Sequence, residues 1–322
     1  MKNEKENNQM QKMLGAYPTM ITPFLEDGSV DYETVKKYVH WYHENGCEGI
    51  FAVCQSSEIF FLSNEEIVKI NKLVYETAQE IYKNGGHKMM IVSSGHTADD
   101  IETQAKEFCA VAESGTDALI WITNRLDINN EGDDTWIANA EKLLKLLPED
   151  IKFGLYECPY PYKRLLTPRF IKWCVETGRF YFLKDTCCDA AMIRERLELM
   201  KGSNFCLLNA NCQTLLQSLK DGGHGYCGIM SNYHPKLYNW MCENFDKEPE
   251  KAELLQAFLG TAGFTENGIP YPLTAKYHMN LVGIETANVA RSRKSEELTQ
   301  YAKDCVRQIK TLSDYFEKVI IG

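Results

Sequence analysis

The residue with the most distinctive chemistry is Lys184, which ends an apolar run. Phe180–Leu183 precede it and Asp185 follows it; four apolar or aromatic residues in a row are typical of a strand buried on both faces. A lysine held among apolar neighbours loses part of its preference for the charged form, so Lys184 is a candidate nucleophile for Schiff-base chemistry on a carbonyl substrate. The alternative is an ordinary lysine that reaches solvent and pairs with Asp185.

Tyr156 is the second candidate, because it ends an apolar stretch one strand–helix unit before Lys184. If the two strands are neighbours in a parallel sheet, they lie about 4.8 Å apart. The phenol could then reach a substrate carbon bonded to the lysine and carry protons during bond formation and cleavage. The alternative is a tyrosine at the sheet rim whose hydroxyl is bonded to a carbonyl.

A third candidate is the polar run that follows another apolar stretch, Cys54–Glu58. The backbone N–H groups of Gln55, Ser56 and Ser57, together with the two serine hydroxyls, could hold a carboxylate. A plain polar turn would have the same composition. The functional interpretation depends on the place of this run at a strand end, which it shares with Tyr156 and Lys184.

The elements that must position these residues alternate regularly along the chain. Eight strand–helix units are predicted, which is the pattern of a (β/α)8 barrel, where the carboxyl ends of the strands form the reactive face. An open doubly wound sheet would need a glycine-rich loop after the first strand, and Pro23–Leu25 is not one. The strands are predicted at 15–22, 49–53, 88–92, 118–122, 151–156, 180–184, 205–208 and 225–230.

The domain organisation follows from the same pattern. Residues 1–13 are polar and charged and are expected to form a flexible N-terminal arm. Residues 14–246 are expected to form the barrel. Residues 247–322 contain only helical patterns and are expected to form a C-terminal helical appendage, with helices at 248–264, 271–281 and 295–320.

The composition is that of an ordinary globular protein, with 44% hydrophobic and 25% charged residues in 322. The formal net charge of −10 argues against nucleic acid or an anionic membrane surface as the main partner. No apolar run approaches the roughly 18 residues of a membrane span, and the first residues lack the apolar core of a signal peptide. We therefore expect a cytoplasmic protein.

The twelve cysteines are scattered and do not form a secreted disulfide framework. Several follow predicted strand ends, where thiolates could bind zinc, but they share no short spacing and have no nearby histidine. We expect free thiols and no metal. The cysteines at the predicted rim are Cys54, Cys158, Cys187, Cys188 and Cys212.

In order and at the right spacing, short motifs along almost the whole chain resemble one family, that of dihydrodipicolinate synthase and N-acetylneuraminate lyase, the class I pyruvate aldolases. Each motif is weak alone, but together they are specific. The motifs are Thr22–Phe24 with Asp27–Asp31, Cys54–Glu58, Tyr156–Pro159, Leu183–Asp185, Gly222–Gly225 and Asn267–Pro270.

The resemblance implies that Lys184 holds pyruvate or another 2-oxo acid as an imine and that Tyr156 shuttles protons. It also implies a homotetramer, or a dimer, that needs no cofactor or metal. The substrate-binding positions that we carry over are Gln55, Ser56, Ser57 and Cys227.

The departures from the family pattern concern the proton relay and the second half of the substrate. Gln55 replaces the first hydroxyl residue of the loop, and Thr123 stands where the synthases have a second relay tyrosine. Pro161 falls where they have an arginine for the second carboxylate, although Lys163 or Arg164 could substitute. Two glycines of the loop are also replaced, by Cys54 and Ser57, so the loop loses backbone freedom.

These departures leave three functional hypotheses. The first is a Schiff-base lyase or aldolase acting on a 2-oxo acid other than the lysine-pathway substrate. The second is a dihydrodipicolinate synthase with an altered relay. The third is a weakly catalytic member that binds a small molecule, against which the presence of both Lys184 and Tyr156 speaks.

Overall fold

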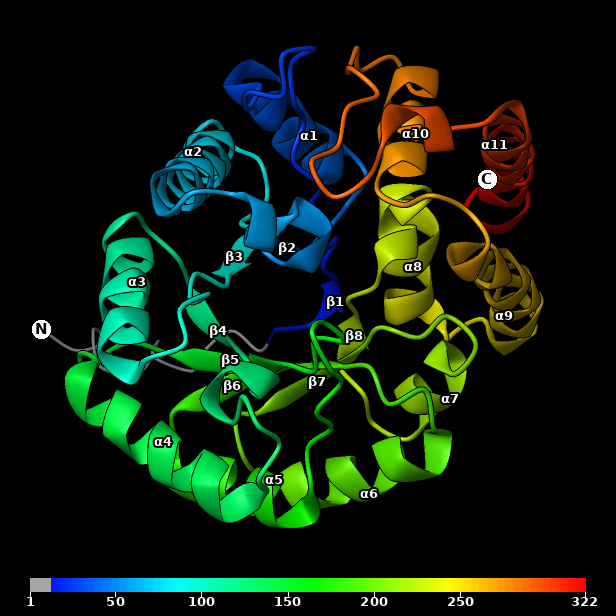
Figure 1. The fold of residues 1–322 in the computed structure, drawn as a ribbon. Helices are drawn as coiled ribbons and strands as arrows, with labels where there is room; N and C mark the ends of the chain where they lie inside the picture. Colours follow the sequence, from blue (N-terminus) through cyan, green and yellow to red (C-terminus); the bar gives the residue numbers. More distant parts are fainter. Residues whose placement is uncertain (1–12) are drawn as a thin grey trace, which may run out of the picture.

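Eight parallel strands curl into a nearly closed barrel surrounded by helices (Figure 1). The structure is a computed structural model and describes residues 13–322. The strand order is β1-β8-β7-β6-β5-β4-β3-β2, and a bridge between Thr19 and Phe51 joins the two outermost strands. The predicted (β/α)8 barrel is therefore confirmed. The strands are β1 (Gly15–Ala16), β2 (Gly49–Phe51), β3 (Met90–Ser93), β4 (Ala118–Ile122), β5 (Phe153–Tyr156), β6 (Phe180–Asp185), β7 (Cys206–Asn209) and β8 (Gly225–Tyr226).

Eight helices alternate with the strands, and three more follow the barrel within the described residues. Local signals set several of their starts: Ser63 and Glu66 form the capping box of α2, and Thr167 caps α5 just before Pro168. No helix in the described part is both long and apolar enough to cross a membrane. The helices are α1 (Tyr32–Glu44), α2 (Asn64–Lys83), α3 (Ile101–Glu113), α4 (Asp133–Leu146), α5 (Pro168–Thr177), α6 (Ala190–Met200), α7 (Leu215–Lys220), α8 (Pro235–Asn244), α9 (Pro249–Gly263), α10 (Leu273–Leu281) and α11 (Gln300–Ile320).

The structure differs from the sequence prediction at both ends and at the eighth strand. The predicted helix 295–320 is divided, because Thr299 accepts a hydrogen bond from the amide of Ala302 and starts α11 afresh. Strand β8 ends at Tyr226, so Cys227 lies just after it. Residues 1–12 of the predicted arm are outside the described residues, and Met13 is buried in the core.

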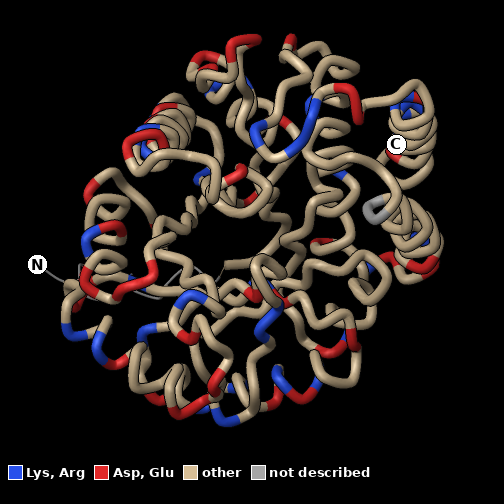
Figure 2. The backbone as a smooth tube through the Cα atoms, viewed as in Figure 1, with Lys and Arg blue, Asp and Glu red and all other residues tan. Residues whose placement is uncertain are grey.

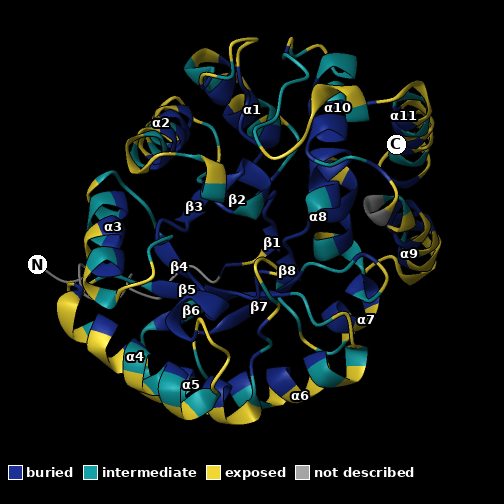
Figure 3. Ribbon diagram, in the orientation of Figure 1, coloured by how far each residue is buried: buried dark blue, intermediate teal, exposed yellow. Residues whose placement is uncertain are grey.

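Aromatic side chains fill the barrel interior below its open end. Phe182 packs against Tyr17 and Phe51, with ring centroids 5.5 and 6.2 Å apart. Figure 3 shows the strands almost entirely buried, while the surrounding helices expose their outer faces. The aromatic layer closes the barrel from below, so a cavity can open only at the carboxyl ends of the strands.

A buried ion cluster fixes the loops that follow β5 and β6. The guanidinium of Arg196, on α6, donates to Glu157 at 2.7 Å and also to Asp185. Glu157 in turn accepts hydrogen bonds from the amides of Leu166 and Thr186, at 2.7 and 2.8 Å. One cation thus ties together the two strand ends that carry Tyr156 and Lys184.

Replacing this cation should destabilise the whole barrel. Arg196→Ala leaves two buried carboxylates without their counter-charge, and we expect a loss of about 3–5 kcal/mol in the free energy of unfolding, measured by urea denaturation. Arg194→Ala, on the same helix but in an exposed pair with Asp221, should cost less than about 1 kcal/mol. Equal losses in the two variants would contradict the role of the cluster.

Candidate active site

Lys184 and Tyr156 face each other at the open end of the barrel. They are register partners on β6 and β5, and Lys184 Nζ lies 4.2 Å from the centroid of the Tyr156 ring. Both residues are only 4% exposed. Successive side chains of a strand point to opposite faces, so Asp185 points outward to Arg196. The alternative that paired Lys184 with Asp185 is therefore wrong, and Lys184 makes no ion pair within residues 13–322.

The phenol of Tyr156 is held in a defined orientation. Its hydroxyl donates to Gln55 Oε1 at 3.2 Å, and the thiol of Cys158 donates to the same oxygen at 3.4 Å. Burial raises the pKa of Tyr156 well above its usual value, so the phenol keeps its proton. An amide oxygen can accept this hydrogen bond but has no proton to pass on. Gln55, which we noted in place of a hydroxyl residue of the family's proton relay, therefore contacts the Tyr156 hydroxyl directly.

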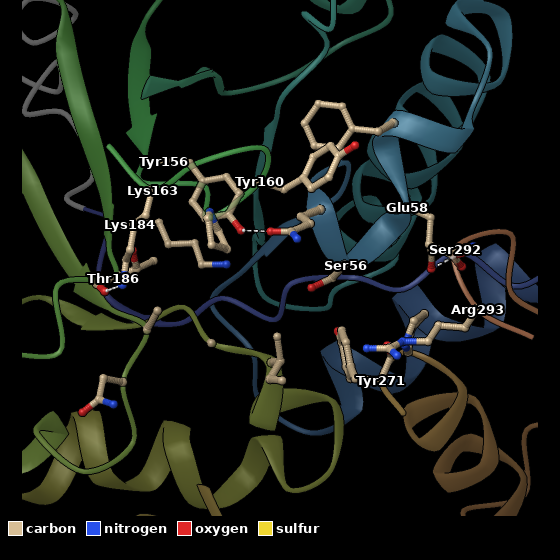
Figure 4. A pocket seen from close by; sticks show the side chains of 18 of the residues that line it. Ser56, Glu58, Tyr156, Tyr160, Lys163, Lys184, Thr186, Tyr271, Ser292 and Arg293 are labelled. Atoms are coloured by element: carbon tan, nitrogen blue, oxygen red, sulfur yellow. Dashed lines mark hydrogen bonds between the residues drawn. The ribbon is translucent and has the colours of Figure 1, made fainter. Parts of the chain in front are cut away.

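A cavity of about 730 Å³ opens above these two residues. Figure 4 shows its walls, with Lys184 and Tyr156 on one side and Tyr271 and Arg293 on the other. A volume of this order accommodates a molecule much larger than a three-carbon acid. The lining residues used below are Gln55, Ser56, Tyr156, Lys163, Lys184, Tyr271, Ser292 and Arg293.

Ser56 is the part of the predicted carboxylate loop that reaches the cavity. Its hydroxyl donates to Thr19 at 3.0 Å and remains on the cavity wall. The amide N–H groups of Gln55 and Ser56 begin a short 3₁₀ turn, and neither has an acceptor among the described residues. Unpaired N–H groups beside a hydroxyl are suitable partners for a carboxylate.

Ser57 and Cys227 do not line the cavity. The Ser57 hydroxyl lies 2.7 and 3.0 Å from the carbonyl oxygens of Met20 and Ala52, so it holds the loop against the first two strands. The thiol of Cys227 is fully buried, and burial raises its pKa to about 12. The geometry thus gives these two residues supporting positions beside the cavity.

Glu58 takes the backbone conformation that a glycine would ordinarily take in this loop. Its φ is 63°, which is strained for a residue with a side chain. The carboxylate is held by the ammonium of Lys276 at 3.1 Å and by the amides of Arg291 and Ser292, both at 2.7 Å. These bonds fasten the segment after α10 to the rim of the cavity, a connection that no local motif predicts.

Of the two basic residues expected to replace the family's arginine, only Lys163 lines the cavity. Its ammonium donates to the carbonyl oxygen of Thr186. Arg164 is buried in ion pairs with Asp127 and Asp133, at 3.2 and 3.1 Å, and its prediction as a substrate ligand has no geometric support.

Two other residues singled out in the sequence, Thr123 and Cys188, have different positions relative to the cavity. Thr123 donates its hydroxyl to the carbonyl oxygen of Arg164 at 2.9 Å and is fully buried. Cys188 is the rim cysteine whose side chain is exposed, and it lines the cavity. Within the described residues, no three His, Cys, Asp or Glu side chains gather as metal ligands would.

Sequence reasoning missed three cavity-lining residues from the C-terminal segment: Tyr271, Ser292 and Arg293. They lie more than eighty positions beyond Lys184 in the chain, and nothing local marks them as part of a site. Only the run of basic residues in Arg291–Lys294 could have drawn notice.

The model of the dihydrodipicolinate synthetase family matches residues 12–311. The 4-hydroxy-tetrahydrodipicolinate synthase of Pseudoalteromonas atlantica is 25% identical over 273 residues, covering 83% of this chain and 88% of the relative. The enzyme of the same name from Haloarcula marismortui is 24% identical over 303 residues, covering 92% and 94%.

Solved structures agree on the fold. A dihydrodipicolinate synthase from Acinetobacter baumannii, complexed with pyruvate, superimposes with a TM-score of 0.81 at 18% identity, covering 94% of this chain and 99% of the other. A prophage protein of the same family from E. coli K12, also in complex with pyruvate, gives 0.79 at 18% identity, covering 95% and 99%.

The burial of Lys276, which outweighs the opposing effect of Glu58 on its pKa, predicts a pH dependence of stability. Burial lowers the pKa of Lys276 from 10.5 to about 8, so between these values the unfolded chain binds more protons than the folded one. The free energy of unfolding should therefore rise from pH 8 to 10.5 through this group. The difference between the wild type and Lys276→Met, followed by urea denaturation across this range, measures it; a difference that does not change with pH would contradict the assignment.

Proposed function

Since the chain belongs to the dihydrodipicolinate synthetase family, we propose that it is a Schiff-base-forming lyase or aldolase acting on pyruvate or another 2-oxo acid. Its curated relatives carry the name of a lyase-type enzyme, 4-hydroxy-tetrahydrodipicolinate synthase. The observation that carries the proposal is the buried amine of Lys184, free of any ion pair in the described part and 4.2 Å from the ring of Tyr156.

Imine formation uses the residues around that amine. The amine of Lys184 attacks the keto carbon through its nitrogen lone pair and gives up a proton, while the keto oxygen takes one; loss of water from the resulting carbinolamine leaves the imine. Tyr156 is our candidate to give and take protons in these steps, because its hydroxyl is protonated and its ring lies 4.2 Å from the lysine Nζ. The carboxylate of the 2-oxo acid would lie against Ser56 and the free amides of the loop.

The imine then makes the next carbon acidic. Loss of a proton from that carbon gives an enamine, which can form a carbon–carbon bond to an aldehyde; the reverse sequence cleaves one. Gln55 keeps the Tyr156 hydroxyl directed to one acceptor, so protons reach the phenol from substrate or water in the cavity rather than through a chain of hydroxyl groups.

The alternative is 4-hydroxy-tetrahydrodipicolinate synthase, the activity named for the relatives. Two observations argue against it as the first choice: the amide of Gln55 stands in the relay, and no arginine follows β5 in the cavity, where Arg164 is buried in ion pairs. A weakly catalytic small-molecule binder is a further alternative. We also propose a homotetramer, or a dimer, in the cytoplasm.

The Schiff base is tested by borohydride trapping. Pyruvate and a panel of larger 2-oxo acids should each be tried, and at least one should give a reduced adduct on the peptide that carries Lys184. Lys184→Arg, which keeps a long basic side chain but cannot form the imine under the same conditions, should give none. An adduct on another lysine, or none with any 2-oxo acid, would overturn the proposal.

Tyr156→Phe separates trapping from turnover. The variant should still form the adduct but lose about 10²–10⁴-fold in rate, because a positioned proton donor is removed. Tyr315→Phe, an exposed tyrosine on α11, serves as the matched control and should not change the rate.

Condensation with aspartate semialdehyde distinguishes the two enzymatic hypotheses. We expect the chain to exchange the methyl protons of pyruvate with solvent, yet to condense pyruvate with the semialdehyde slowly or not at all. The two rates are measured side by side on one preparation. Robust condensation, comparable with exchange, would favour the synthase.

A further inference from the structure

We propose that Arg293, on the segment between α10 and α11, binds an anionic group, most simply a carboxylate, on the half of the substrate that is remote from Lys184. The inference rests on the proposed function, which places a 2-oxo acid on Lys184, and adds the chemical class of the second half. Arg293 would then determine substrate specificity. It does not come from the loop after β5, where the sequence suggested that Lys163 or Arg164 could replace the family's arginine.

Arg293 stands at the rim of the cavity with much of its hydrogen-bonding capacity available. Its Nε donates to the carbonyl oxygen of Tyr271 at 3.3 Å, and Nη1 pairs with Glu297 at 3.0 Å. Its side chain is 46% exposed, and Figure 4 shows it extending beside Tyr271 on the side of the cavity opposite Lys184. Because the pair with Glu297 is exposed to solvent, it is weak, so a substrate carboxylate can replace it.

The backbone that carries Arg293 is fixed rather than loose. Glu58 binds the amides of Arg291 and Ser292 and the Ser292 hydroxyl, each at 2.7 Å. The guanidinium of Arg291 grips Glu66 on α2 through two bonds of 2.7 Å. Figure 2 shows this basic stretch at the rim of the barrel mouth. Arg293 is thus presented to the cavity at a defined place, which lowers the entropy lost on binding a ligand.

The charges around the cavity favour an anion at this end. Glu58 lines the cavity beside the segment, and both of its oxygens are occupied, one by the ammonium of Lys276 and the other by three donors of the segment. The wall between the two ends of the cavity is neutral: Tyr271 accepts from Asn232 at 3.1 Å, and burial raises the pKa of its phenol well above normal.

The cavity is large enough to hold a second half of the substrate beyond the 2-oxo acid. A 2-oxo acid bonded to Lys184 and seated on Ser56 fills only one side of a space of about 730 Å³. The rest extends to Tyr271 and Arg293, so a longer substrate reaches the guanidinium. A guanidinium matches a carboxylate through two parallel hydrogen bonds, which an uncharged chain end cannot make.

The test is a ladder of 2-oxo acids with five to eight carbons, each in two forms that differ only at the far end, a carboxylate or a methyl group. Half-saturating concentrations are measured by borohydride trapping. At one or more lengths the carboxylate form should saturate at roughly tenfold lower concentration, an advantage that falls with added salt. Arg293→Gln should remove the advantage, and Arg293→Lys should keep part of it.

Glu297→Gln gives a change of opposite sign. Its side-chain oxygen can still accept from the amide of Lys294, as Glu297 does at 2.9 Å, but it no longer competes as a charge for Arg293. The preference for the carboxylate form should then increase. If Arg293 only stabilised the fold, Arg293→Gln and Glu297→Gln would weaken trapping of the carboxylate and methyl forms equally. That result would overturn the inference.

Two further variants complete the design. Arg194→Gln removes an exposed guanidinium on α6, outside the cavity, and should leave the preference unchanged. Lys163→Gln tests the rival cation on the other side of the cavity. A preference that is lost in Lys163→Gln and kept in Arg293→Gln would assign the carboxylate to Lys163 and refute the proposal.

Calorimetric titration with the same acids separates this inference from the proposed function, because it needs no imine. If the carboxylate forms bind in an Arg293-dependent manner but no adduct forms, the subsite stands and the Schiff-base proposal falls. If adducts form but no chain length shows an Arg293-dependent preference, this inference falls alone. If neither trapping nor calorimetry shows a preference for the carboxylate form over the methyl form, the inference about Arg293 is also refuted.

Discussion

The structure depends on the alternation of side chains along β6. Phe182 and Lys184 point into the barrel, where Phe182 packs in the aromatic layer and Lys184 lies beside Tyr156. Asp185, one residue on, points outward and joins Arg196. Adjacent basic and acidic side chains are thus separated by the pleat of a single strand. The amine is left among aromatic rings without a carboxylate partner in the described part of the chain, and this is the condition that its chemistry requires.

A second arrangement joins the barrel mouth to the C-terminal helices. Glu58 accepts bonds from α10 through Lys276 and from the segment before α11 through Arg291 and Ser292. The loop that supplies Ser56 to the cavity is therefore held by the same carboxylate that positions the opposite wall. A change in either the loop or the segment is expected to alter both the binding of the 2-oxo acid and the recognition of its distal part.

Periodicity was sufficient to predict the eight strand–helix units, since strands buried on both faces and capped helices leave strong local signals, as at Ala118–Ile122 and Ser63–Glu66. The lack of a glycine-rich loop after the first strand then favoured a barrel over an open sheet. The pairing of Tyr156 with Lys184 followed from their positions at the ends of neighbouring strands. Side-chain direction could not be predicted for the loops. Ser56 and Ser57 are adjacent and alike, yet one faces the cavity and the other bonds to the backbone behind it. Arg293 was missed because long-range contacts through Glu58 bring it to the site.

The most direct test of the central claim is a crystal structure of the protein treated with pyruvate and borohydride. The account predicts continuous density from Nζ of Lys184 to the second carbon of pyruvate, with the carboxylate against Ser56 and the hydroxyl of Tyr156 within hydrogen-bond reach. Pyruvate bound without a covalent bond, or bonded with its carboxylate directed away from Ser56, would contradict it.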